Sequence, residues 1–420
     1  METNNIIKSI KKIAWSIIDA CGVVFPIIDI WKIKRYVRRR GNTLLICVPC
    51  SIKKYCDTHN DEYHVVEKAQ KRIVFEPAFF EQSECEEHYC EAKEIYVAEL
   101  KDVVIHGGTG LITAEDIVLT DVCENDTENR VLYTFGKILR GSRKAFYIEV
   151  CSEIDEMDTV INLCGLASFN YYHLTFEILS RFEYIKDRID KDNVTVLLDE
   201  SAGKYSQYRD LIHAVIGNAK VRYVKETERV FCRKVIYPSM NTWMPMNVRK
   251  KDLFRISDNL IAESAILNIK KATEKYRKKR TGKRVFVSRK NTEYSRISNE
   301  DEVVKLFKKA GFEVACTEEL SFQQQIELFS SASCIVGASG AALTNLVYCN
   351  PGTVFGCIIP REYRFCIYSS IAYMMGCNVL FLDAEIVKAD KYISTEQCKV
   401  DLDVCNRYII QLSSMIEKED

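Results

Sequence analysis

The fold is decided by three segments of this chain: Arg284-Val-Phe-Val-Ser-Arg289, Ser333-Cys-Ile-Val336 and Gly337-Ala-Ser-Gly-Ala-Ala-Leu-Thr-Asn345. The first two contain short apolar runs, which are typical of buried strands. The third begins with a glycine turn and continues into a helix that we expect to start near Ala341. This alternation predicts half of a doubly wound parallel sheet, a fold that binds ligands at the carboxyl ends of its strands.

Two further helices are expected between these strands, because each has an N-terminal capping signature. Ser298 with Asp301 opens one helix, and Ser321 with Gln324 opens the other. Gly311 marks the end of the first helix, before a strand over Phe312–Ala315. The whole stretch therefore forms one continuous α/β unit.

The glycine turn of this unit suits an anion. Free backbone N–H groups and the positive end of a helix dipole point into such a turn, and glycine lets the backbone approach a phosphate closely. Arg289 and Arg296 follow the first strand and can reach the same edge of the sheet. The alternative is a tight turn with packing glycines and solvated arginines, and the spacing alone leaves both open.

A second group of polar residues follows the strand expected at Thr159–Leu163. It runs Asn170-Tyr-Tyr-His173-Leu-Thr-Phe-Glu177-Ile-Leu-Ser-Arg181, so a helix would bring His173, Glu177 and Arg181 to one face. A carboxylate beside an imidazole can take a proton from a hydroxyl. The alternative is an ordinary exposed ion pair worth a few tenths of a kcal/mol.

Together these blocks resemble glycosyltransferase family 61, the proteins often described as capsular polysaccharide biosynthesis proteins. The blocks occur in the family's order and cover roughly residues 90–385. The resemblance implies an inverting enzyme with the GT-B fold and a nucleotide-sugar donor. It also implies two doubly wound Rossmann-type domains facing a cleft, with a short-strand, β-rich portion near the N-terminus.

The resemblance assigns roles to individual residues. It makes Glu177 the catalytic base, with His173 beside it. The donor would be bound by the following residues: Arg289, Arg296, Gly337, Ser339, Gly340, Ala341, Thr344 and Asn345. The acceptor would be bound or oriented by Asn170, Tyr172 and Arg181.

The chain departs from the family pattern at two positions. Ser339 stands where the family usually has a histidine between the glycines, and Leu174 stands where it usually has Trp or Phe. A serine can donate one hydrogen bond to a phosphate oxygen, but it cannot supply a cationic imidazolium. This substitution motivates a second hypothesis, a catalytically silent sugar-nucleotide-binding protein. A third is a sugar-nucleotide epimerase of the same architecture, against which the Asn-Tyr-Tyr-His173 motif argues.

Composition sets the broad class of the protein. The chain has 420 residues, and its 59 basic and 59 acidic side chains cancel, which argues against a nucleic-acid partner. Its 18 cysteines are scattered, many within apolar runs, which indicates a reducing compartment. Cys47, Cys50, Cys56 and His59 have zinc-like spacing, but no second ligand pair follows, so we expect no metal site there. No Asp-x-Asp metal motif is obvious near a strand end, although Asp401-Leu-Asp403 has the bare spacing, and we expect metal-independent catalysis.

The N-terminal residues 1–40 differ from the rest. Ile13–Trp31 is mostly apolar, but two aspartates and a proline make a membrane-spanning helix costly. With its flanking lysines and arginines, this segment either lies on the inner face of a membrane or packs on the protein as a helix. The sequons at Asn125 and Asn193 are expected to be coincidental.

The predicted organisation therefore has four parts. Residues 1–40 form the N-terminal segment, residues 41–275 an acceptor-side domain, residues 276–395 a nucleotide-sugar-binding domain, and residues 396–420 a helix that packs back on the acceptor-side domain. We expect a hexosyl- or pentosyltransferase that acts on a glycan or lipid-linked acceptor in surface polysaccharide biosynthesis. Its expected location is the cytoplasm, peripheral to the membrane.

Overall fold

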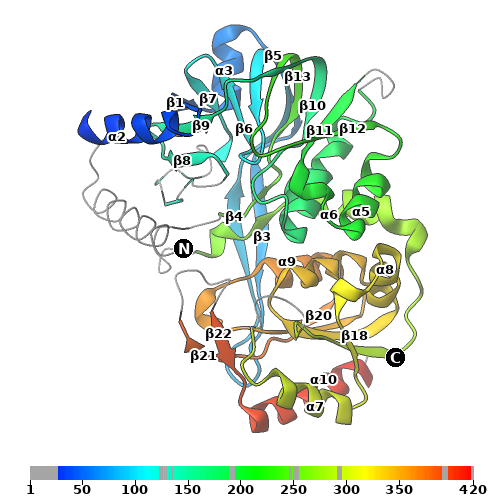
Figure 1. Cartoon of the computed structure of the whole chain (residues 1–420). Coiled ribbons are helices and arrows are strands. Elements are labelled where there is room, and N and C mark those ends of the chain that lie inside the picture. The colour runs from blue at the N-terminus through cyan, green and yellow to red at the C-terminus, as the bar shows by residue number, and fades with distance from the viewer. Residues whose placement is uncertain are drawn as a thin grey trace.

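The computed structural model describes residues 27–122, 136–188, 194–245, 255–290, 296–389 and 396–417, with the single positions 126, 128, 130, 131, 133 and 248. Two large sheets lie one above the other, with helices between and around them (Figure 1). We call residues 27–273 the N-terminal half and residues 283–417 the C-terminal half. The largest apolar core contains side chains from both halves, including Ile266 and Ile371, so the two halves share buried surface.

The sheet of the N-terminal half is mixed and has eleven strands. In spatial order these are β12 (Lys220–Val224), β11 (Thr195–Asp199), β10 (Asp155–Asn162), β13 (Arg229–Pro238), β5 (Ile95–His106), β6 (Leu111–Ala114), β7 (Ile117–Leu119), β1 (Thr43–Cys50), β9 (Phe146–Val150) and β8 (Ile138–Gly141), with β2 (Glu62–Glu67) paired to β5. Strands β10 to β13 are parallel, and β1 is parallel to β7. The other pairs are antiparallel.

This topology confirms the β-rich N-terminal portion, and it confirms the second doubly wound sheet in part: the parallel strands stand in the doubly wound order β12-β11-β10-β13 at one end of a mixed sheet. Only β10 to β13 form a parallel unit, because β13 pairs on its other side with the antiparallel β5. The apolar runs Ile95–Ala98 and Val103–Ile105 belong to the single strand β5. Their shared partner β13 is long enough to pair with both.

Short helices cover this sheet. They are α3 (Ile52–His59), η1 (His173–Ile178), η2 (Leu179–Tyr184), η3 (Glu200–Gly203), α5 (Ser206–Ile216), η5 (Ile256–Asp258), α6 (Glu263–Thr273) and η6 (Glu274–Tyr276). Before α6, Leu260–Ile261 form β15, which pairs with β14 (Thr242–Trp243).

A β-hairpin joins the two halves. Its strands β3 (Gln70–Glu76) and β4 (Glu86–Ala92) run down beside the sheet of the C-terminal half (Figure 1). At the tip, the Phe80 N–H donates to the carbonyl of Phe381 at 2.9 Å. Glu81 accepts a hydrogen bond of 2.7 Å from Arg407. The β3–β4 hairpin of the N-terminal half therefore packs on the C-terminal half. The predicted domain boundaries stay a prediction.

The sheet of the C-terminal half has five parallel strands, as the sequence predicts. In spatial order these are β17 (Glu313–Ala315), β16 (Lys283–Val287), β18 (Ala332–Ala338), β19 (Val354–Ile358) and β20 (Asn378–Val379). This is the doubly wound order 2-1-3-4-5, in which ligands bind where the strand order reverses. Here that point lies between β16 and β18, which Arg289 and the glycine turn follow.

Helices pack on both faces of this sheet: α7 (Glu300–Lys309), η7 (Thr317–Glu319), α8 (Phe322–Ser331), η8 (Ala341–Tyr348), η9 (Arg361–Tyr363) and α9 (Ile367–Met374). The capping box of α8 is confirmed, because the Ser321 hydroxyl accepts from Gln324 N–H and the Gln324 side chain accepts from Ser321 N–H. The cap of α7 is Asn299 rather than Ser298. The Asn299 side chain exchanges two hydrogen bonds with the backbone of Val400, which fixes this end of the helix.

The last helix corrects a second expectation. α10 (Leu402–Glu417), which follows a small hairpin of β21 (Glu385–Lys388) and β22 (Gln397–Lys399), packs on the C-terminal half. Its Tyr408, Leu412 and Ile416 are buried against the sheet β16–β19, and the Tyr408 hydroxyl donates to Leu380 O at 2.7 Å. From the N-terminal half, α10 meets the hairpin tip at Phe80 and Glu81. The apolar face of α10 is thus covered by its own half.

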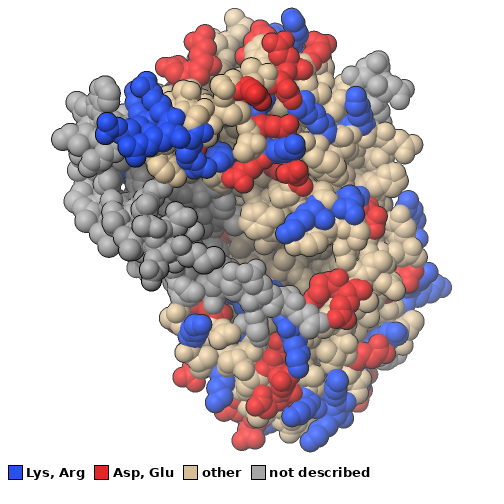
Figure 2. Space-filling view, viewed as in Figure 1, with Lys and Arg blue, Asp and Glu red and all other residues tan. Residues whose placement is uncertain are grey.

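The N-terminal segment is described from α2 (Ile27–Arg38) onward, so residues 1–26 lie outside the described part of the chain. The asparagines of the two sequons, Asn125 and Asn193, also lie outside it. α2 packs against β1 and buries Val37. Its Lys34, Arg35 and Arg38 are exposed, and basic side chains gather on this part of the surface in Figure 2. Among the described helices, none has the length and apolar character needed to cross a bilayer.

Candidate active site

The segment that carries Glu177 is a π-helix rather than the expected α-helix. It spans His173–Ile178 and continues as the 3-10 helix η2. Two hydroxyls donate back to carbonyls one turn earlier: Thr175 to Tyr171 at 2.6 Å and Ser180 to Phe176 at 2.5 Å. Such bonds compete with the regular ladder, and π-turns occur frequently at functional sites.

Despite this change, His173 and Glu177 lie together as predicted. His173 Nδ1 and Glu177 Oε2 are 2.6 Å apart, with the histidine buried and the carboxylate mostly covered. The second carboxylate oxygen, Oε1, has no hydrogen-bond partner within the described residues. A buried carboxylate oxygen without a partner is costly, which suits an atom that meets a substrate.

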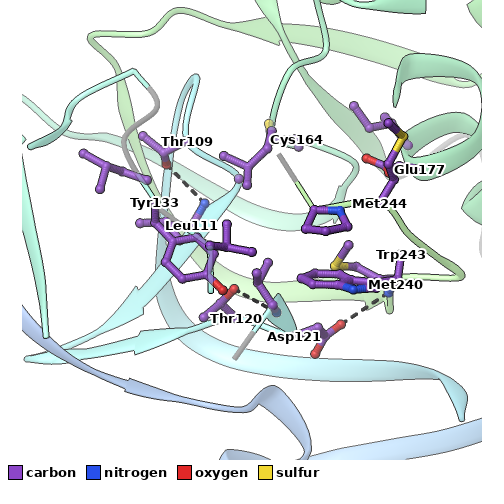
Figure 3. Close-up of a pocket in the computed structure, with 18 of the residues that line it drawn as sticks. Thr109, Leu111, Thr120, Asp121, Tyr133, Cys164, Glu177, Met240, Trp243 and Met244 are labelled. Carbon is purple, nitrogen blue, oxygen red and sulfur yellow. Dashed lines mark hydrogen bonds between the residues drawn. The ribbon is translucent and has the colours of Figure 1, made fainter. Parts of the chain in front are cut away.

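Glu177 projects into a cavity of about 80 Å³ at the carboxyl ends of β10 and β13. Figure 3 shows Glu177 on one side and Tyr133 and Leu111 on the opposite side. Most of the lining is apolar or aromatic: Leu111, Val131, Tyr133, Ile138, Phe146, Ile178, Met240, Trp243 and Met244. Asp121 lies at the cavity edge but is held by Tyr96, Tyr237 and Met240 N–H.

The three residues expected to orient the acceptor have different environments. Asn170 caps the helical turn, because its side-chain oxygen accepts from Tyr172 N–H at 2.9 Å. Tyr172 is buried, and its hydroxyl has no hydrogen-bond partner among the described residues. Burial, with a contribution from the nearby Glu177 carboxylate, raises the pKa of Tyr172. Arg181 lines the cavity, although it already donates to Pro238 O at 3.1 Å.

The glycine turn and Arg289 form a second site in the C-terminal half, where the strand order of the parallel sheet reverses between β16 and β18. A Cβ on Gly340 would stand only 1.4 Å from Arg289 Nη1, so the guanidinium rests directly on this glycine. A Cβ on Gly337 would approach the Val287 side chain to 3.0 Å. Both glycines therefore permit close approach, one to an arginine and one to a neighbouring strand.

Arg289 and Arg296 are electrostatic neighbours. Burial lowers the pKa of both guanidinium groups, and the positive charge of Arg289 lowers that of Arg296 further. Two partly buried like charges in proximity favour an anion between or beside them. Glu300 holds the Arg289 backbone in place, since its Oε1 accepts from Ser288 Oγ at 2.6 Å and from Arg289 N–H at 2.9 Å.

A cavity of about 470 Å³ opens beside Arg289, between the two halves. The C-terminal half contributes Ser288, Arg289, Thr317, Glu318, Gln325, Ala341, Ala342 and Asn345. The N-terminal half contributes Phe169, Tyr171, Tyr205, Gln207 and Tyr208. No motif in the sequence marks Tyr205 and Tyr208, although their place at the start of α5, after the parallel strand β11, is where a ligand-facing loop is expected.

The other residues of the glycine block divide into two groups. Ala341 and Asn345 line the cavity, and Asn345 donates to Gln325 Oε1 at 2.9 Å. Thr344 is fully buried and does not line it. Ser339 is half-buried, and its N–H donates to Ile358 O at 3.1 Å.

The cavity of Glu177 and the cavity beside Arg289 have different lining residues, and two tyrosines interact electrostatically with the charged groups nearby. Tyr172 interacts electrostatically with Glu177 and with Tyr368. Tyr368 in turn interacts with Arg289 and Arg296. One buried tyrosine from each half therefore lies within electrostatic range of the charged groups of these two sites.

The side chains with metal-like spacing in the sequence have other roles in the structure. Asp401 of the Asp-x-Asp spacing caps α10, accepting from Asp403 and Val404 N–H at 2.9 Å. Cys47 and Cys56 are buried, and burial raises their pKa values to about 11 and about 12. Within the described ranges, one group able to chelate a metal is Glu76, Glu86 and His88, on the β3–β4 hairpin and outside both cavities.

The sequence matches one known protein family over part of its length. Residues 171–356 match the family described as Glycosyltransferase 61, a range that includes Glu177, Arg289 and the glycine turn. No curated protein matches the sequence.

Two solved structures are weakly similar, each at 9% identity. E. coli heptosyltransferase WaaC with ADP is covered over 100% of its length and 62% of this chain, at a TM-score of 0.29. The iron-containing dodecameric glycosyltransferase TibC from enterotoxigenic E. coli is covered over 92% of its length and 85% of this chain, at 0.25. These scores are too low to support an argument, so the family match carries the comparison.

Proposed function

Because residues 171–356 place this chain in glycosyltransferase family 61, and the chain is therefore a glycosyltransferase, we propose that it is an inverting enzyme of the GT-B type. It moves a hexose or pentose from a nucleotide-sugar donor to a hydroxyl of a glycan or lipid-linked acceptor, in surface polysaccharide biosynthesis such as capsule formation. The donor occupies the cavity beside Arg289, and the acceptor hydroxyl enters the cavity of Glu177.

The observation that carries this proposal is the unpartnered Oε1 of Glu177. The other oxygen of the same carboxylate is held by His173 at 2.6 Å, so the group is oriented while one lone pair faces the cavity. In an inverting transfer, one base removes the acceptor proton as the hydroxyl attacks opposite the leaving diphosphate. Glu177 is the base, and His173 orients it.

The leaving diphosphate is stabilised at the other site. Its negative charge faces the guanidinium group of Arg289, which lines this cavity, and the N-terminus of η8 after the glycine turn; Arg296, whose pKa the charge of Arg289 lowers, adds positive charge nearby. Packing and Glu300 hold these guanidinium and N–H groups in place before the nucleotide sugar binds, so little reorganisation is needed. We propose that they replace a metal ion in this role.

A second candidate function is a sugar-nucleotide-binding protein without activity. The observation that favours it is Ser339, which offers the leaving group no cationic imidazolium. Donor hydrolysis distinguishes the two functions, since an active transferase releases some nucleoside diphosphate without acceptor and a binding protein releases none.

The test uses a panel of UDP-, GDP- and ADP-linked sugars with the full chain. Each is first tested by thermal shift, because a ligand of the native state raises the apparent melting temperature. Release of nucleoside diphosphate from the binding members is then measured with and without EDTA. We expect slow, EDTA-insensitive release from at least one donor. Binding without any release supports the silent protein, and the absence of binding contradicts both.

We propose that the N-terminal 40 residues associate with the inner face of a membrane, near lipid-linked acceptors. The exposed Arg35, Arg38, Arg39 and Arg40 of the described part carry the positive charge that this requires. Removing residues 1–40 is expected to abolish sedimentation with anionic vesicles at low salt while donor hydrolysis continues. If the full chain ignores such vesicles, the segment is a packed helix.

A further inference from the structure

Asp199 is a buried carboxylate at the end of β11 that joins two loops. Its Oδ1 accepts from Gly108 N–H at 2.6 Å, and its Oδ2 accepts from Gly165 N–H at 2.8 Å. Gly108 lies in the turn between β5 and β6, and Gly165 lies in the loop after β10. Asp199 is only 1% exposed, so water does not supply these bonds in its place.

The pKa of Asp199 is consistent with an ionised carboxylate that accepts hydrogen bonds. Burial raises the pKa of Asp199 to about 6, and the hydrogen bonds from Gly108, Gly165 and Ser168 offset part of this rise. The carboxylate is therefore ionised at neutral pH and accepts both backbone N–H groups. Retaining a charge in such a place is costly unless its bonds are needed.

The loop that Asp199 holds packs directly on the helical segment of Glu177. A Cβ on Gly165 would meet Ile178 Cγ1 at 2.8 Å, and Arg181 Nη2 lies 3.8 Å from the same point. A Cβ on Gly110, in the turn of Gly108, would lie 3.1 Å from Leu166 N. Gly165 and Glu177 also line the same cavity. A shift of this loop must therefore move either the cavity wall or the π-helical turn.

We propose that Asp199 is a positioning residue: by fixing the Gly165 loop against Ile178 and Arg181, it sets where the Glu177 carboxylate meets the acceptor. This inference rests on the proposed function, because it gives that position a catalytic meaning. Asp199 does not line the Glu177 cavity and acts through Gly165.

The test replaces Asp199 by asparagine, which keeps the shape but turns one acceptor into a donor that faces a backbone N–H. Asp210→Asn, an exposed position on α5, is the matched control. For the most active donor of the panel, we expect Asp199→Asn to lower kcat of hydrolysis about tenfold and to change KM less than twofold. Arg289 and the glycine turn, which would bind the diphosphate, lie in the other half, so nucleoside diphosphate affinity should change little.

The pH profile separates positioning from general damage. Asp199 interacts electrostatically with Cys164, which Arg181 also affects, and it lines an adjoining cavity together with Glu200, Lys204 and Glu226. Below about pH 6 Asp199 takes up a proton and its acceptor capacity falls, so wild-type kcat should decline there. In Asp199→Asn this part of the decline should be missing, and kcat should already be low at neutral pH.

Hydrogen exchange tests the same idea without any donor. Peptides covering residues 163–181 should exchange faster in Asp199→Asn than in wild type and in Asp210→Asn, while the peptide over Ala341–Tyr348 should not change. Unchanged exchange at 163–181, or an unchanged kcat and pH profile, overturns the proposal. A wild-type protein that cleaves no donor contradicts the proposed function instead, and the exchange experiment still decides whether Asp199 holds the loop.

Discussion

The two halves of this molecule build their sites in different ways. In the C-terminal half, five parallel strands in the order 2-1-3-4-5 bring Arg289 and a glycine turn to the point where strand order reverses. In the N-terminal half, the parallel unit continues into antiparallel strands, and Glu177 lies on a π-helical turn. Both sites lie at the carboxyl ends of parallel strands, as the general rule for such sheets predicts, but the second site also depends on a local irregularity.

This difference corresponds to a division of work. The regular half offers backbone N–H groups and guanidinium groups, which suit a diphosphate. The irregular half offers one oriented carboxylate in an apolar cavity, which suits proton removal. Changes in the N-terminal half should therefore affect rate, and changes in the C-terminal half should affect donor binding.

The largest effect is expected for Glu177→Gln. The amide keeps the shape of the side chain but cannot take a proton, so kcat should fall by about 10²–10⁴ while nucleoside diphosphate affinity changes little. Steady-state kinetics and titration calorimetry measure the two quantities. Glu263→Gln, an exposed change on α6, is the control. Near-normal turnover in Glu177→Gln would make His173 the better candidate for the base.

The next effect is expected for Arg289→Ala. One charge-assisted hydrogen bond to a phosphate contributes about 1.5–3 kcal/mol, so nucleoside diphosphate binding should weaken about 10- to 100-fold. Arg361→Ala on the exposed η9 should bind as the parent does. If calorimetry gives equal affinity for Arg289→Ala and the parent, the diphosphate is bound elsewhere.

A smaller loss is expected for Gly340→Ala. The new Cβ would overlap Arg289 Nη1, so the guanidinium must move, but its charge stays near the site. We expect binding to weaken roughly three- to tenfold, less than for Arg289→Ala. Adding Gly340→Ala to Arg289→Ala should cost almost nothing more, because the clash is gone. A full additional loss in the double variant would show that Gly340 acts on the ligand directly.

The smallest effect is expected for Ser339→His. A histidine here restores the residue usual in the family and should leave diphosphate affinity unchanged or improve it by up to about tenfold. The gain should appear mainly below about pH 6.5, where an imidazole of ordinary pKa is protonated. A steep loss with an unchanged melting temperature would show that this turn differs from the family pattern.

Sequence reasoning reached the C-terminal site more completely than the N-terminal one. Apolar strand runs, the Ser321–Gln324 capping box and the glycine turn are local signals, and each was sufficient to place its element. The Arg289–Gly340 contact was not predictable, since it depends on how two strand ends meet.

In the N-terminal half, the pair His173–Glu177 was predicted but its π-helical geometry was not. That geometry arises from hydroxyls of Thr175 and Ser180 that bond back to carbonyls, a choice that depends on packing. The prediction that α10 packs on the N-terminal half was wrong for a similar reason, because an apolar helix face does not determine which of two cores covers it.

The stereochemistry of donor cleavage tests the central claim most directly, because a single base acting in one displacement inverts the anomeric carbon. The sugar released from an α-linked nucleotide sugar by hydrolysis can be followed by proton NMR before mutarotation. The account predicts that the β-anomer appears first with the wild-type protein and that Glu177→Gln slows its appearance by at least about 100-fold. Early release of the α-anomer, or release that does not depend on Glu177, would contradict it.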